Sequence, residues 1–290
     1  MFTSKVNNML KILKCDFTRI IINRGFAVAI IVTAVLCFSV QVYSDQSNEK
    51  VYSLIEALFT LDRGFMTGKS DFSPPVIINK ALSGYSSMAL PVTASFPFVL
   101  SFTAERSSGN MLYTISRTSR RKYYFSKFIT AITGGGLCTM LGVILFGISV
   151  YILFPNVNST DLITQTFTNN VFAFLTKKLL SAFVYGMTSA LPAFFLCSFC
   201  KNSYIILCVP FMLNFISETL LAKFQANAGA SGNFNAYDLA ALFYPNAASN
   251  LVYRTIDKTF WEIVAVNVIW AVIVLAGFVI IMEKRSDRGR

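Results

Sequence analysis

The sequence predicts an all-α polytopic membrane protein with six transmembrane helices, an N-terminal interfacial helix and both termini in the cytoplasm. Of its 290 residues, 54% are apolar and 13% are charged, and the mean hydropathy is +0.58, far from a soluble average. The apolar residues gather in runs of about 20, the length that a helix needs to cross a bilayer core of ~30 Å. Lys and Arg concentrate in alternate connections between these runs, as is typical of cytoplasmic segments.

Residues 1–24 have the pattern of an amphipathic helix that lies along the inner leaflet. Apolar residues recur every three or four positions, and bases such as Lys5, Lys11 and Lys14 take the opposite face. A turn at residues 23–25 then leads into the first span. The alternative is an ordinary basic flank of that span.

The whole chain, 1–290, is expected to form a single transmembrane domain. Connections 44–83 and 223–258 are expected to be extracellular loops, and each contains an amphipathic patch, at 51–59 and 237–245, suited to a short helix. The spans are predicted near 21–43, 84–104, 124–154, 179–200, 204–222 and 260–282.

The distribution of charge orients the chain. Of the 25 Lys and Arg residues, 16 lie in the N-terminal segment, the 105–127 connection, the turn at Lys201 and the C-terminal tail. The positive-inside rule therefore places these segments in the cytoplasm. In a soluble chain a net charge of +11 would suggest a nucleic-acid partner, but here the charge follows the topology and implies none.

The residues offer no catalytic centre. The chain has no His, and its carboxylates are scattered, so no general acid–base pair or metal cluster is expected and the chain is predicted not to be an enzyme. Gly64–Ser70 imitates a phosphate-binding loop but has three residues between its glycines, where that loop needs four. Cys197 and Cys200 have the spacing of a metal or redox pair, but in apolar surroundings we interpret them as buried small hydrophobes.

Glu218 is a carboxylate within an apolar run, with Asn214 one turn before it. One interpretation is a polar patch on a translocation path; the alternative is a hydrogen bond between packed helices or an acid that reaches toward the headgroups. Glycines at 134–136 lie along the third span, where close helix packing is the expected role.

The connection at 105–123 carries the strongest pattern. It reads Glu105-Arg-Ser-Ser-Gly109, then Met111-Leu-Tyr-Thr-Ile115 and Ser119-Arg120, followed by Tyr123-Tyr-Phe-Ser-Lys127. With six spans and an interfacial N-terminal helix, this pattern resembles the permeases of ABC-2 type ABC transporters, over nearly the whole chain.

The resemblance implies that this connection forms a short coupling helix which docks on a separate ATPase subunit. Ser107 or Ser108 could cap that helix, and the bases would hold its end near anionic lipid or an acidic partner. The alternative is that the bases only fix the topology. The residues expected to couple to the ATPase are Glu105, Gly109, Met111, Leu112, Ile115, Arg117, Arg120 and Arg121.

The resemblance further implies two ATPase copies, which would bind the ATP and Mg, and a second permease half, identical or related. The chain itself is expected to hold no cofactor and to contact membrane lipid. The implied function is export of a hydrophobic or amphiphilic substrate, such as a peptide, antibiotic or lipid, across a bacterial cell membrane. Two other functions stay open: an ion-coupled secondary transporter, and a membrane sensor or assembly subunit that transports nothing.

Overall fold

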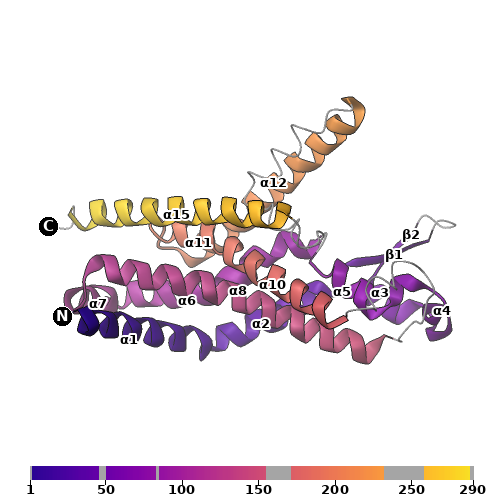
Figure 1. Ribbon diagram of the computed structural model, residues 1–290, viewed down its shortest axis with the longest axis horizontal. Coiled ribbons are helices and arrows are strands. Elements are labelled where there is room, and N and C mark those ends of the chain that lie inside the picture. The colour runs from indigo at the N-terminus through magenta and orange to yellow at the C-terminus, as the bar shows by residue number, and fades with distance from the viewer. Residues whose placement is uncertain (1, 46–49, 83–84, 155–170, 232–257, 288–290) are drawn as a thin grey trace.

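The computed structural model describes residues 2–45, 50–82, 85–154, 171–231 and 258–287. α1 begins and α15 ends at the end of the molecule that carries α7, and the β1–β2 hairpin lies at the opposite end (Figure 1). We call these the α7 end and the hairpin end. In chain order the elements are α1 (Phe2–Ile21), α2 (Arg24–Cys37), β1 (Gln41–Asp45), β2 (Lys50–Ser53), α3 (Leu54–Thr60), α4 (Arg63–Thr67), η1 (Ser70–Phe72), α5 (Pro74–Lys80), α6 (Tyr85–Ser107), α7 (Asn110–Arg117), α8 (Arg120–Leu153), α10 (Val171–Ser189), α11 (Leu191–Leu196), α12 (Ser203–Ser231) and α15 (Lys258–Asp287).

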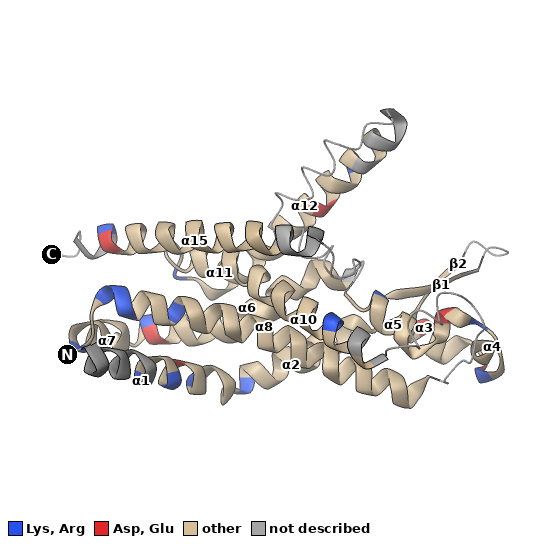
Figure 2. Cartoon of the chain, in the orientation of Figure 1, with Lys and Arg blue, Asp and Glu red and all other residues tan. Residues whose placement is uncertain are grey.

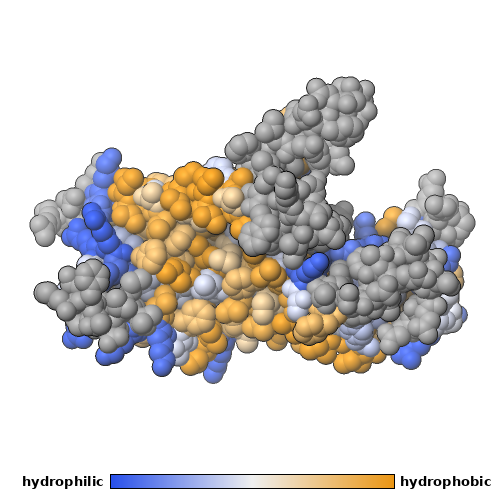
Figure 3. Space-filling view, in the orientation of Figure 1, coloured by the Kyte–Doolittle hydropathy of each residue, from blue (hydrophilic) through white to orange (hydrophobic). Residues whose placement is uncertain are grey.

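Within the described ranges, five helices are long and apolar enough to cross a membrane, or six if the bent pair α1 and α2 forms one span. This confirms the predicted polytopic helical architecture. Apolar side chains cover the middle of the bundle, and hydrophilic ones gather at the α7 end (Figure 3). The membrane-compatible segments are Ser86–Ser107, Arg120–Leu153, Leu175–Leu196, Ser203–Phe224 and Val264–Lys284.

The first predicted span, 21–43, is wrong in its boundaries. α2 ends at Cys37, and the chain enters β1 at Gln41. A helix of 14 residues rises only about 21 Å, which is short of a ~30 Å bilayer core. The axes of α1 and α2 meet at 58°, where the Asn23 side chain accepts the N–H of Gly25 at 3.1 Å. A complete crossing here therefore needs part of α1 as well.

The structure adds a β-hairpin to the helical fold, which the sequence analysis did not predict. β1 and β2 pair antiparallel, with Asp45 opposite Lys50. The amphipathic patch at 51–59 becomes helical only at Leu54, because Ser53 and Glu56 form a reciprocal capping box. The bonds from Ser53, first that of its backbone N–H, lower the pKa of the Glu56 carboxyl below its usual value.

α8 is the central helix of the bundle and packs against α1, α2, α6 and α10. Its glycines allow this, as predicted for close packing. A Cβ added to Gly135 would lie 2.8 Å from the carbonyl oxygen of Gly186 in α10, and one on Gly142 would lie 2.5 Å from the Thr33 side chain in α2. The helix backbones therefore approach more closely than any larger residue permits.

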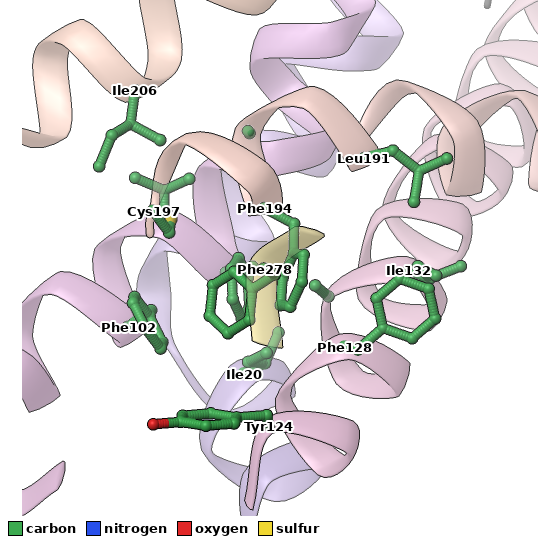
Figure 4. Packing of buried hydrophobic residues seen from close by; sticks show 14 of the residues in the cluster. Ile20, Phe102, Tyr124, Phe128, Ile132, Leu191, Phe194, Cys197, Ile206 and Phe278 are labelled. Atoms are coloured by element: carbon green, nitrogen blue, oxygen red, sulfur yellow. The ribbon is translucent and has the colours of Figure 1, made fainter. Parts of the chain in front are cut away.

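α15 joins the bundle through an aromatic cluster close to the α7 end (Figure 4). The Phe278 ring lies 4.2 Å from that of Phe194 in α11, between centroids, and it also contacts Phe102 and Tyr124. Phe278 is fully buried, whereas much of the remaining apolar surface of α15 is exposed. In a membrane, lipid or another protein would cover that surface.

The last helices differ from their predicted boundaries. α12 continues to Ser231, nine residues beyond the predicted end at 222, because that run contains no proline and alternates good helix formers such as Ala226, Ala228 and Ala230 with weaker ones. The fourth predicted span is divided into α10 and α11, and Pro192 lies at the start of α11. The rest of the loop at 223–258, including the patch at 237–245, lies outside the described residues.

Candidate functional site

The connection between α6 and α8 contains a short helix, α7, at the place where the resemblance implies a coupling helix. Gly109 precedes α7 with φ of +73°, a left-handed conformation that glycine adopts without strain. The two serines do not cap the helix: Ser107 and Ser108 donate their hydroxyl protons back to the carbonyls of Ala104 and Glu105. The predicted serine cap is therefore wrong, and the turn at Gly109 starts the helix instead.

α7 has one face on the bundle and one face exposed. Met111 is buried and Ile115 packs partly buried against the same aromatic cluster. Leu112 is 75% exposed and Tyr113 57% exposed, and the Arg117 guanidinium lies 4.2 Å above the Tyr113 ring. Met111, Leu112 and Ile115 were predicted to form one apolar face for a partner. Of these three residues, only Leu112 is exposed.

Glu105, also predicted to take part in coupling, points into the protein. It is 5% exposed, and its carboxylate accepts hydrogen bonds from the Tyr123 hydroxyl at 3.0 Å and the Lys127 ammonium at 2.5 Å. Arg19 of α1 lies 3.4 Å from the same carboxylate. Glu105 therefore faces the helix bundle and is not part of the exposed face of α7.

Lys127 connects Glu105 to a second buried acid, Asp16 of α1. Its ammonium lies 2.7 Å from the Asp16 carboxylate, whose other oxygen accepts the Ser126 hydroxyl at 2.8 Å. Asp16, Glu105 and Lys127 are all less than 10% exposed. We call these three residues together with Arg19 the ion cluster. It ties α1, α6 and α8 together directly beneath α7.

The ion cluster is balanced in charge, with two acids and two bases. Moving each ion out of water costs several kcal/mol, and this cost is offset only when every charge is paired. Lys and Arg gather at the α7 end (Figure 2). In these basic surroundings, Asp16 and Glu105 are the acids that pair with the buried Lys127. The cluster therefore joins α1 to α6 and α8 near the start of α7.

The sequence analysis did not single out Asp16 or Lys127 as partners. A signal was present, because Asp16 continues the apolar stripe of Leu13 and Ile20 at spacings of three and four residues. An acid on the buried stripe of an amphipathic helix needs a buried base. The sequence could not show that this base lies more than 100 residues away.

The three arginines predicted for coupling occupy different positions. Arg117 lies on the exposed side of α7, and Arg120 and Arg121 begin α8. The Arg121 side chain is 86% exposed and lies 3.8 Å from Glu283 in α15. Arg106, which was not predicted to be a coupling residue, donates to the backbone carbonyls of Cys197 at 2.9 Å and Cys200 at 3.0 Å. It therefore provides hydrogen-bond donors to carbonyl groups at the C-terminal end of α11.

The structure brings Asn214 and Glu218 together on one partner, Ser87 of α6. The Asn214 amide donates to the Ser87 carbonyl at 2.8 Å, and Glu218 accepts the Ser87 hydroxyl at 2.8 Å. Tyr185 of α10 donates to the same carbonyl at 2.6 Å. These contacts are interhelical hydrogen bonds among α6, α10 and α12, as the packing alternative predicts.

Gly64–Ser70, which imitates a phosphate-binding loop, spans the end of α4 and the start of η1, and Lys69 lies over the rings of Tyr43 and Phe65 at 5.8 and 5.9 Å. Cys197 is buried and both it and Cys200 are free thiols. Across the described ranges, no three His, Cys, Asp or Glu side chains are grouped to hold a metal ion.

No protein family model matches this chain, and no curated protein matches it significantly. The candidate site is therefore defined by its own geometry: a short helix with an exposed Leu112–Arg117 face, supported by the ion cluster.

Proposed function

We propose that this chain is the membrane-spanning permease subunit of an ATP-driven exporter, and that a separate ATPase docks on α7. The observation that carries the proposal is the exposed face of α7. Leu112 and Tyr113 are large, apolar and exposed at the basic end of the molecule, beside Arg117. Apolar anchors flanked by Arg are typical of protein–protein contacts.

The contacts beneath α7 give a route by which docking could move the spans. α7 joins α6 to α8 directly, and the ion cluster links those two helices to α1. A push on α7 would therefore be transmitted to three helices together. ATP binding and hydrolysis in the partner would supply that push, and the chain would shift between inward and outward arrangements.

In the proposed assembly, two ATPase copies bind ATP and Mg, and a second permease half, identical or related, completes the path. The cargo is hydrophobic or amphiphilic, such as a peptide, antibiotic or lipid, because few charged groups lie within the spans. Both termini and α7 face the cytoplasm of a bacterial cell, in accord with the excess of bases at this end. The Asn214 and Glu218 patch is a candidate part of the path.

The test is binding of a co-expressed ATPase that is encoded beside this chain and has no spans of its own. Leu112→Glu should weaken that binding about 30-fold, the effect of losing one interface anchor of about 2 kcal/mol. The matched control is Phe59→Glu, which changes an 83%-exposed aromatic residue at the hairpin end. Equal ATPase binding by both variants would refute docking on α7.

The side of the membrane on which α7 lies is tested by a separate experiment. A cysteine introduced by Ser116→Cys on the exposed side of α7 should react with a membrane-impermeant thiol reagent only when the cytoplasmic side is open. Reaction in sealed cells would place α7 outside and would exclude an intracellular ATPase. Transport by the purified chain alone, without any ATPase, would likewise contradict the proposal.

A further inference from the structure

A groove of about 980 Å³ lies between α1 and the second half of α6, at the α7 end. It is separate from the exposed face of α7. Its α1 wall carries three bases, Lys11, Lys14 and Arg19, but most of the lining surface is apolar. The lining residues are Lys11, Lys14, Cys15, Thr18, Arg19, Ile22, Asn23, Leu100, Ser101, Ala104, Glu105, Ser108 and Asn110.

The chemistry of the groove changes along its length. Lys11 and Lys14 are exposed one turn apart near one end of the α1 wall, and Ile22 is 76% exposed at the other end, opposite Leu100. Ile22 follows Lys11 by eleven positions, a rise of about 16 Å along α1. A soluble anion would use only the basic end, whereas an amphiphile would use both.

The acids near the groove do not cancel its positive charge. Glu105 is the one carboxylate among the lining residues, and it is buried against Lys127 and Arg19. Asp16 lies behind the α1 wall and is paired with Lys127. The Arg19 side chain is 50% exposed, so the guanidinium also has N–H groups available to a ligand in the groove.

We propose that this groove binds one anionic phospholipid. The phosphate lies against the ammonium groups of Lys11 and Lys14, and the acyl chains leave past Ile22 and Leu100 onto the apolar surface of the bundle. The lipid thereby fills the space between α1 and α6 and adds to the contacts of the ion cluster. This inference does not depend on the proposed transport function, because it concerns only the seating of α1.

The test measures lipid retained by the purified chain in detergent, by native mass spectrometry. The probes are phosphatidylglycerol and phosphatidylcholine with the same acyl chains. The unaltered chain should retain one phosphatidylglycerol in preference to phosphatidylcholine. Lys11→Gln with Lys14→Gln should weaken that retention about 30-fold, since each base near an anionic lipid contributes about 1 kcal/mol. Ala104→Phe, which fills the groove without a change in charge, should also abolish it.

The matched control is Lys201→Gln with Lys284→Gln, two exposed bases outside the groove that the topology predicts on the same side. This control should retain phosphatidylglycerol as the unaltered chain does. Equal losses in both double variants would show general charge attraction and would overturn the site. Displacement of the lipid by soluble glycerol phosphate at the same concentration would make the ligand a soluble anion and would overturn the lipid assignment.

Cys15 gives the location of the bound lipid. It is an exposed free thiol in the lining of the groove. Phosphatidylglycerol should slow its alkylation in the unaltered chain but not in Lys11→Gln with Lys14→Gln. Cys208 of α12 is exposed outside the groove and serves as the internal reference. An unchanged alkylation rate at Cys15, with lipid bound, would place the lipid elsewhere.

Discussion

Removal of the Lys127 ammonium is the sharpest test of the ion cluster. Lys127→Met keeps the length of the side chain but leaves Asp16 and Glu105 without the ammonium that both contact, at 2.7 and 2.5 Å. Breaking a buried ion pair by removing one partner costs about 3–5 kcal/mol, because the remaining charge is buried and uncompensated. We expect a loss of the free energy of unfolding in this range.

Loss of the Lys127 ammonium should leave Asp16 with fewer hydrogen-bond partners than Glu105. Glu105 keeps the Tyr123 hydroxyl and Arg19, whereas Asp16 keeps only the Ser126 hydroxyl among its contacts in the cluster. Most of the loss should therefore come from Asp16. Adding Asp16→Asn to Lys127→Met should restore more than half of the lost stability, although Asp16→Asn alone removes a partner from Lys127 and is itself destabilising.

The assay is reversible unfolding of the purified chain in mixed micelles, followed by circular dichroism. Lys122→Met is the matched control, because Lys122 is a neighbouring base of α8 outside the cluster and is partly exposed. Its effect should stay within about 0.5 kcal/mol. If Lys127→Met were no more destabilising than Lys122→Met, or if Asp16→Asn failed to rescue it, the ion cluster would not hold α1 to the bundle.

Three further substitutions are checked by the same unfolding assay. Gly109→Ala should cost about 1 kcal/mol, because its φ of +73° strains any residue with a Cβ, and Gly109→Asn should cost less; equal effects would contradict this. Gly135→Ala should cost about 1–3 kcal/mol because its Cβ would lie 2.8 Å from a carbonyl of α10, while Gly147→Ala, with 3.6 Å to its nearest neighbour, should change little. Ser87→Ala removes the hydroxyl that bonds Glu218 and should cost about 0.5–2 kcal/mol; no loss would mean that the bond does not stabilise the packing of α12 on α6.

Some features of this fold follow from local sequence. Hydropathy averaged over about 20 residues predicted the spans of α6, α8 and α15 closely. This works because membrane insertion of a helix depends on the summed apolarity of its own residues. The first span was wrong at its C-terminal end. Its apolar run continues to Val42, but residues 41–45 pair with 50–53 as strands. Strand pairing is a contact between segments, and apolarity alone does not distinguish it from a helix.

In the candidate site, too, some features follow from local sequence and others depend on contacts between distant segments. The resemblance carried by the residues from Glu105 to Ile115 implied a short helix here, and the structure has a helix at Asn110–Arg117. Its amphipathic pattern could not show which apolar residues face the bundle, because both sides carry large apolar side chains. Packing against α6 and α8 decides that Met111 is buried and Leu112 exposed.

The sequence by itself determined that the chain is apolar enough to cross a membrane, where the helices α6, α8 and α15 lie, and which segments carry the excess of bases. Those properties add up residue by residue along one segment. Only the tertiary structure decided that Asp16 and Glu105 share Lys127, and that a groove opens beside them between α1 and α6. A buried charge is stable only with a partner close in space, and the chain brings such partners together from helices far apart in the sequence.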